Sequence, residues 1–325
     1  MNKVLRIILN ILIFSVIIGF VWYMARSLGK QEPLFGSFSL TRQDEGVSAY
    51  MKVNTIKVKS DIISFELTNS NIYIALNQAV MITDYAGVLI TQFPVGKVIR
   101  DIKVDDGCIY LLYPAALEVF TYQGEKIASW EARRNNSDYC AMALSSEYIY
   151  VTDAENKNIC QYTKEGEFLS IILSPNGFVI PSFSFDIINI NDTIYCSNSG
   201  RLQIERFTLA GRYIDSFGKA GEEAGSFAGC CNPAYLAATQ HGDILTSEKG
   251  VPRISCFGQD GQFRALLFGS KSLGGGTKAY RMKTNNDRIF VAGKNTLSEF
   301  VYDPQLAAQS SCAGCPIDCL LRKGL

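Results

Sequence analysis

A short β-strand pattern that recurs six times along this chain sets the strongest limit on its fold. The copies read "NIYIAL", "CIYLLY", "YIYVTD", "TIYCSN", "DILTSE" and "RIFVAG", and each follows a turn. Their marker isoleucines stand 37, 40, 45, 50 and 45 residues apart, at Ile72, Ile109, Ile149, Ile194, Ile244 and Ile289. Such intervals match one four-stranded blade of a β-propeller. The repeat therefore predicts an all-β, six-bladed β-propeller.

Each of the first five copies continues to a glycine placed 15 to 17 residues after the marker isoleucine. Glycine supplies the positive φ that a tight hairpin needs. In each of these copies an aliphatic residue stands seven residues before the glycine. In four of them an aromatic residue also stands four residues before it. We expect both side chains to pack between blades. The glycines are Gly87, Gly124, Gly166, Gly211 and Gly261.

Two copies resemble the NHL repeat closely. They are residues 149–169, "IYVTDAENKNICQYTKEGEFL", and residues 231–263, in which Asn232-Pro233 precedes the expected innermost strand as the family's proline does. The resemblance covers residues 50–305 and implies an NHL-like propeller, although the first, second and sixth copies lack the proline. It implies a fold much more than a function.

The ring must also be closed, because an unpaired strand edge favours aggregation. The segment "TIKVKSDIISFELT", which begins at Thr55, is expected to pair with the blade that contains Ile289. We expect no seventh blade.

The N-terminal segment predicts a membrane anchor. Residues 7–24 contain no charge, and Lys3 and Arg6 precede them. An uncharged and mostly apolar run of 18 residues can span a bilayer, and the flanking charges favour a cytoplasmic N-terminus. We expect an uncleaved signal-anchor helix over residues 1–28, with a cleaved signal peptide as the alternative, and the propeller on the extracytoplasmic side of the cell membrane. A linker over residues 29–50, the propeller over 51–305 and a Cys-rich tail over 306–325 complete the domain organisation.

Charge and histidine content exclude several functions. Residues 1–30 carry four of the 31 basic side chains and no acid, so the remainder has 27 basic against 31 acidic side chains. That balance argues against nucleic-acid binding, which needs a concentrated basic surface. His241 is the single histidine, so neither a multi-histidine zinc site nor a Ser-His-Asp triad can form.

Three polar residues are candidates for a metal on the propeller axis. Asp153, Asn198 and Glu248 each stand four residues after a marker isoleucine. Calcium binds such oxygen ligands, as in lactonase-like propeller hydrolases. The alternative is that each residue closes a local turn.

Five cysteines lie outside the expected strand cores. Cys230 and Cys231 are adjacent in the loop "AGCCNPA", and the tail "SSCAGCPIDCLLRKGL" has the spacing C-x2-C-x3-C at Cys312, Cys315 and Cys319. This spacing resembles part of a bacterial ferredoxin motif, so one loop cysteine and the tail could hold an iron–sulfur cluster or zinc. Disulfides between the loop pair and the tail, or inert thiols, are the alternatives. A direct bond between neighbouring cysteines is disfavoured because their Cα atoms are too close.

The other five cysteines are expected to be packing residues within the blades. Loops that lead into the innermost strand share a face of a propeller with loops between the second and third strands. "AGCCNPA" and "EKGVP" should therefore meet. The binding face predicted there consists of Asn232, Glu248, Lys249, Arg253 and Lys278.

These observations predict a membrane-anchored, extracytoplasmic β-propeller that acts as a protein-binding or assembly module for an envelope partner. No acid–base pair or nucleophile is evident, which favours binding over catalysis. Three alternatives remain open: a redox role with a Cys-ligated cofactor, a hydrolase with axial calcium, and a disulfide-stapled binding domain without a cofactor.

Overall fold

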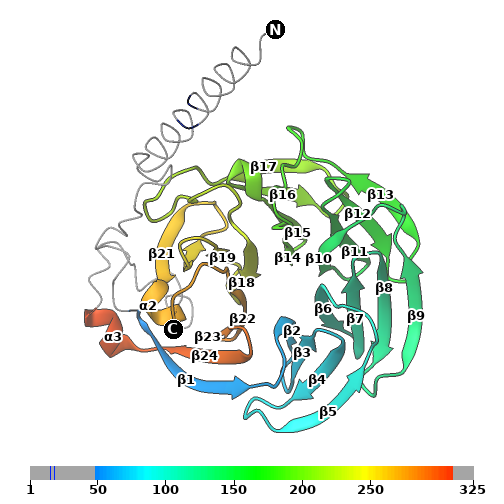
Figure 1. The fold of residues 1–325 in the computed structure, drawn as a ribbon, viewed down its shortest axis with the longest axis horizontal. Helices are drawn as coiled ribbons and strands as arrows, with labels where there is room; N and C mark the ends of the chain where they lie inside the picture. The colour runs from blue at the N-terminus through cyan, green and yellow to red at the C-terminus, as the bar shows by residue number, and fades with distance from the viewer. Residues whose placement is uncertain (1–14, 16–17, 19–47, 310–325) are drawn as a thin grey trace, which may run out of the picture. The chain divides into compact units, whose positions relative to one another are not determined.

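The computed structural model of this protein describes residues 48–309, together with Ser15 and Ile18. Six four-stranded antiparallel sheets surround a central axis in the propeller unit (Figure 1). The predicted six-bladed, all-β fold is therefore confirmed. Among the described residues, no helix is long and apolar enough to cross a membrane. Apart from Ser15 and Ile18, the predicted anchor lies outside the described residues, and so do most of the predicted linker and the tail cysteines.

The first three blades each use four consecutive strands, and the first strand of each is the one nearest the axis. Blade 1 contains β2 (Ile62–Leu67), β3 (Ile72–Leu76), β4 (Ala79–Thr83) and β5 (Leu89–Pro94); blade 2 contains β6 (Asp101–Asp105), β7 (Cys108–Tyr113), β8 (Ala116–Thr121) and β9 (Lys126–Glu131); blade 3 contains β10 (Tyr139–Leu144), β11 (Tyr148–Asp153), β12 (Asn158–Thr163) and β13 (Phe168–Ile172).

The next two blades repeat this order, and the sixth takes its outermost strand from the start of the propeller. Blade 4 contains β14 (Ile187–Ile190), β15 (Thr193–Asn198), β16 (Gln203–Thr208) and β17 (Tyr213–Phe217); blade 5 contains β18 (Tyr235–Ala238), β19 (Ile244–Glu248), β20 (Arg253–Phe257) and β21 (Phe263–Phe268); blade 6 contains β22 (Arg281–Asn285), β23 (Arg288–Ala292), β24 (Thr296–Tyr302) and β1 (Tyr50–Lys57). Short helices η2 (Ser199–Arg201), α2 (Ser270–Leu273) and α3 (Pro304–Gln309) lie outside the sheets.

Strand β1 closes the ring by pairing antiparallel with β24, with Thr55 opposite Ser298 and Ile56 opposite Leu297. The predicted closure is confirmed for this strand only. The second half of the segment, residues 62–67, was assigned wrongly, because it forms β2. A break at residues 58–61 separates the two strands, and blade 1 would have no innermost strand without β2.

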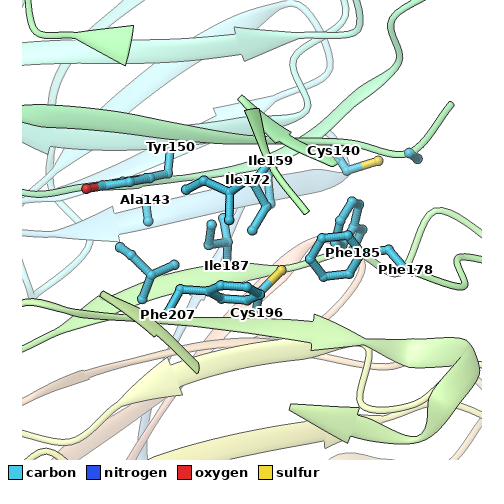
Figure 2. Packing of buried hydrophobic residues seen from close by; sticks show 13 residues of the cluster. Cys140, Ala143, Tyr150, Ile159, Ile172, Phe178, Phe185, Ile187, Cys196 and Phe207 are labelled. Carbon is cyan, nitrogen blue, oxygen red and sulfur yellow. The ribbon is translucent and has the colours of Figure 1, made fainter. Parts of the chain in front are cut away.

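Hydrophobic layers between neighbouring blades form the core. In the layer between blades 3 and 4, Tyr150 and Ile159 face Ile187, Cys196 and Phe207 (Figure 2). Cys196 is fully buried there, and burial raises the pKa of its thiol well above the ordinary value. This cysteine is therefore a packing residue, as predicted.

The five turn glycines all have positive φ, as predicted, between 76° and 90°. Each also faces a side chain of the preceding blade's outer strand at a distance that leaves little or no room for a Cβ atom. A Cβ on Gly124 would lie 2.5 Å from Phe93, and one on Gly166 would lie 2.1 Å from Trp130. These glycines therefore serve both the hairpin and the contact between blades.

Candidate functional site

A cluster of charged side chains fills the centre of the propeller. It lies on or beside the innermost strands β2, β6, β14 and β22, which surround the axis (Figure 1). Most of its members are largely buried. We call it the axial cluster, and its members are Glu66, Asp101, Lys103, Asp186, Arg281 and Lys283.

Asp101 is the hub of the axial cluster. Its carboxylate accepts hydrogen bonds from Ser64 Oγ at 2.6 Å and Lys103 Nζ at 3.0 Å. Backbone N–H groups of Ile102 at 2.9 Å and Met142 at 3.1 Å also donate to it. Arg281 Nη1 lies 3.6 Å away. Asp101 thereby ties together blades 1, 2, 3 and 6.

The surroundings of the two axial aspartates shift their pKa values in opposite directions. Burial alone would raise the pKa of Asp101, but Lys103, Arg281 and Lys283 hold it well below the usual range. Burial does raise the pKa of Asp186, and the charge of Arg281 only partly opposes this. Asp101 is therefore the firmly ionised partner of the cationic side chains.

Asp101→Asn should lower the free energy of unfolding by about 2 kcal/mol at pH 7. A carboxylate whose pKa is lowered by folding stabilises the fold above its unfolded pKa of roughly 4 and loses that contribution as the pH falls further. Urea unfolding between pH 7 and pH 3 should thus show the gap between wild type and variant shrinking below about pH 4. The exposed Asp287→Asn variant serves as control, and a gap independent of pH would contradict this account.

Two connected hollows open on one face of the propeller. We call it the loop face, because the loops leading into the innermost strands lie there. One hollow, of about 380 Å³, covers the mouth of the axis, and the other, of about 540 Å³, lies beside it. Because they share lining residues, we treat them together as the loop-face hollow. The shared residues are Ile62, Ile63, Tyr235 and Arg281.

Two arginines lie at the base of the loop-face hollow. Arg281 stacks on the ring of Tyr235, with its guanidinium carbon 4.5 Å from the ring centroid, and Arg100 pairs with Asp138 at 3.3 Å. Among the described residues, the buried Nε atoms of both arginines have no hydrogen-bond partner. Both guanidinium groups therefore keep unused donor capacity beside the hollow.

The rim of the loop-face hollow presents apolar side chains to solvent. Phe183 is 60% exposed, and Val98 is 47% exposed. Phe183 also has a φ of 56°, a conformation that residues other than glycine rarely adopt. Such backbone strain concentrates at functional positions. The loop thus displays an aromatic ring above the arginines instead of burying it.

The opposite end of the axis, where hairpin turns connect the strands, differs in charge. Its hollow, of about 480 Å³, is lined by two cationic and two acidic side chains: Glu66, Lys103, Asp105 and Lys283. The loop-face hollow has four cationic and two acidic side chains: Arg100, Lys278, Arg281, Lys294, Asp61 and Asp186. The loop face is therefore the more positive end.

The structure places the three predicted axial ligands at the ends of second strands, each bonded to neighbouring loops. Asp153 accepts hydrogen bonds from Asn156 N and Nδ2 at 3.1 and 2.9 Å. Asn198 accepts one from Val179 N at 2.9 Å, and Glu248 binds Arg253. Within residues 48–309, no three His, Cys, Asp or Glu side chains are grouped closely enough to hold a metal ion.

Three residues of the predicted binding face are almost fully buried. Arg253 and Glu248 are each 1% exposed and form a two-pronged ion pair at 2.6 and 3.0 Å. Asn232 joins the two predicted loops, as expected: its Nδ2 donates to Lys249 O, and its Oδ1 accepts from Lys249 N at 2.9 Å. These three residues therefore shape the loops, while Lys249 and Lys278 keep access to solvent.

The adjacent cysteines lie in the loop before β18, and their Sγ atoms are 3.0 Å apart. Cys230 is exposed, and Cys231 is buried. The tail cysteines to which they were predicted to connect, Cys312, Cys315 and Cys319, lie outside the described residues. The predicted cysteine-lined site therefore stays a prediction.

The axial cluster and the arginines of the loop-face hollow were missed in the sequence. A signal was present, because polar residues alternate with apolar ones along several innermost strands. In three of these strands, two polar residues are separated by one residue, which places both on the same face of the strand. The pairs are Ser64 and Glu66, Asp101 and Lys103, and Arg281 and Lys283. Only the propeller geometry shows that these faces meet at the axis.

Neither a protein-family model nor a curated protein matches this chain. Solved structures do. Virginiamycin B lyase of Staphylococcus aureus is 12% identical over 78% of this chain and 98% of its own, with a TM-score of 0.53. A Bacteroides thetaiotaomicron protein of unknown function is 13% identical over 78% of this chain and 74% of its own, with a TM-score of 0.56. The Pan2 WD40 domain of Neurospora crassa is 8% identical over 78% of this chain and 95% of its own, with a TM-score of 0.54.

These neighbours place the chain in the class of β-propeller proteins, and its own sheets make it six-bladed. At such identities the likeness concerns the fold alone. Membership of the NHL family stays a prediction.

Proposed function

We propose that this protein is a binding or assembly module whose loop-face hollow receives an acidic, partly apolar segment of a protein partner. The observation that carries the proposal is the combination of an arginine base and an exposed apolar rim in one hollow. Propellers commonly offer such rigid faces to other proteins.

Charge supports an acidic partner segment. Four cationic side chains line the hollow against two acids, and burial raises the pKa of one of these acids, Asp186. Arg100 and Arg281 both line the part of the hollow above the axis. Arginine binds carboxylates with paired, directional hydrogen bonds.

The shape and polarity of the loop-face hollow support a peptide segment as the ligand that carries the carboxylate. The joined hollows extend beyond the axial mouth, past Tyr280 towards Lys294. Phe183, Val98 and Ile63 offer apolar contact along the rim. Exposed apolar residues around a polar centre are typical of surfaces that bind other proteins.

The N-terminal segment gives the proposal a cellular setting. Residues 7–24 contain no charge, and cationic residues flank them on both sides. We propose that they anchor the propeller on the extracytoplasmic side of the cell membrane, where the partner would be an envelope protein. Binding at the loop face requires no cofactor.

Photo-crosslinking in cells of the source organism tests this function. A benzophenone amino acid at Phe183 should yield a discrete protein adduct, whereas the same group at Ile127, an exposed residue of the outer strand β9, should not. Adding Arg100→Gln should reduce the Phe183 adduct roughly tenfold, since a lost charged contact costs at least 1.4 kcal/mol. Equal adducts at both positions, or an adduct indifferent to Arg100, would contradict the proposal.

A further inference from the structure

We propose that Cys230 and Cys231 form a reversible disulfide with each other, and that this pair is a thiol–disulfide exchange site on the loop face. The oxidant is a disulfide compound, either a small molecule or a partner protein. This inference is independent of partner binding in the hollow. It also differs from the sequence-based expectation, which connected the pair to the tail.

The geometry of the loop carries the inference. Neighbouring side chains in an extended strand point to opposite sides, but here the two Sγ atoms lie 3.0 Å apart. The bend before them is permitted by Gly229, whose φ is 72°. The loop is held at both ends, since Asn232 Nδ2 bonds Lys249 O at 3.0 Å and Glu248 accepts from Ala228 N at 3.1 Å. The sulfurs are therefore brought together by a loop with fixed ends.

The two sulfurs differ in access and surroundings. Cys230 is exposed, whereas Cys231 is buried beside Ser182 and Lys249, which bond to each other. Burial alone would raise the pKa of Cys231, but hydrogen bonds with Cys230 and Ser182 and the charge of Lys249 lower it. The contact with Cys231 raises the pKa of Cys230. One sulfur can thus meet an external disulfide while the other is stabilised as a thiolate.

The other described cysteines lack this combination. Cys140, Cys160, Cys196 and Cys256 are buried, and Cys108 is half-buried. Burial raises the pKa of Cys140 to about 12. A buried thiol of that kind cannot meet an external disulfide and does not readily form a thiolate.

The exchange takes two steps. The Cys230 sulfur, giving up its proton, attacks one sulfur of the external disulfide; a mixed disulfide forms and the first external thiol leaves with that proton. The Cys231 thiolate, whose proton has gone to solvent, then attacks Cys230 Sγ, the ring closes, and the second external sulfur leaves as a thiolate that takes a proton back from solvent. Two protein thiols are oxidised, and one external disulfide is reduced to two thiols.

The closed ring should be easy to reopen. Neighbouring Cα atoms are about 3.8 Å apart, whereas ordinary disulfides span at least about 4.4 Å. A strained, exposed disulfide has a more oxidising potential than a structural one and behaves as a labile or regulatory bond. The pair is therefore suited to a switch and not to a staple.

Peptide mapping of the full-length chain tests the inference. Trypsin should release residues 220–249, which contain Cys230, Cys231 and no other cysteine, and residues 295–322, which contain the three tail cysteines. After treatment with oxidised glutathione, the mass of the first fragment should be lower by two hydrogens, and its two cysteines should no longer react with an alkylating reagent. Dithiothreitol should restore both thiols. The result should persist when Cys312, Cys315 and Cys319 are all replaced by serine.

Three outcomes would overturn the inference: a disulfide linking the two fragments, a stable glutathione adduct on Cys230, or two thiols that stay open to alkylation.

A rate measurement tests the role given to Lys249. Lys249→Gln should slow ring closure roughly threefold to tenfold, since less Cys231 is thiolate, and Lys249→Arg should restore the rate. Lys126→Gln, at an exposed residue of the outer strand β9, should leave the rate unchanged.

Discussion

Gly166→Ala should lower the free energy of unfolding by about 3 kcal/mol. Two costs add at this position. The φ of 86° disfavours any residue with a Cβ, and that Cβ would lie 2.1 to 2.3 Å from atoms of the Trp130 indole. Trp130 belongs to the outer strand of the preceding blade and packs against the layer between blades 2 and 3. The rigid indole must therefore move, and the contact between the blades loosens.

Gly177→Ala provides the matched control. Gly177 has a similar φ of 75°, but apart from its own and its neighbouring residues no described atom lies within 4 Å of the position its Cβ would take. It should cost only about 1 kcal/mol, which is the backbone cost alone. Urea unfolding of the two full-length variants measures the difference. Equal losses would show that the glycine at residue 166 serves only the hairpin and not the packing between blades.

Glu248→Gln should lower the free energy of unfolding by about 3–5 kcal/mol, because it leaves a buried arginine without its counter-charge. Arg253 Nη2 and Nη1 also donate to Ser226 O at 2.6 Å and Glu222 O at 2.9 Å. The ion pair thus connects β19 and β20 to the loop that precedes Ala228. Losing it should disturb the loop of Cys230 and Cys231 as well.

The exposed pair of Arg264 and Asp260, at 2.6 Å, is the control for the buried pair. Asp260→Asn should cost less than about 0.5 kcal/mol, because solvent screens an exposed pair. The double variant Glu248→Leu, Arg253→Met should recover much of the loss, since it leaves no buried charge. Chemical denaturation of all the variants gives the energies. A double variant no more stable than Glu248→Gln would contradict the account.

Much of the fold could be predicted from the sequence because a blade is a local structure. The strands around Ile149 and Ile244 pair with neighbours a few residues away, and the turn at Gly166 has a local signature. Hydrophobic spacing and turn residues are sufficient for such elements. The same local pattern failed at residues 62–67, because it did not show that residues 58–61 form the boundary between two blades.

The candidate site depends on contacts between distant residues and could not be predicted in the same way. Ser64 and Asp101 come from different blades, as do Arg281 and Arg100, and only ring closure brings them to one axis. Glu248 and Arg253 were predicted as members of a binding face, but they are internal partners whose burial depends on the loop above them. The bend that joins Cys230 to Cys231 likewise comes from contacts made by Asn232 and Glu248.

Peptide selection on the full-length protein tests whether the loop-face hollow binds acidic protein segments. A random peptide library displayed on phage would be panned against the wild-type chain, and then against Arg100→Gln and, as control, Arg212→Gln, an exposed arginine in a hairpin turn. We expect enrichment of acidic peptides that contain apolar residues, with binding lost in Arg100→Gln and kept in Arg212→Gln. Enrichment of basic peptides, no enrichment, or binding that survives Arg100→Gln would contradict the assignment of the loop-face hollow as a site for acidic protein segments.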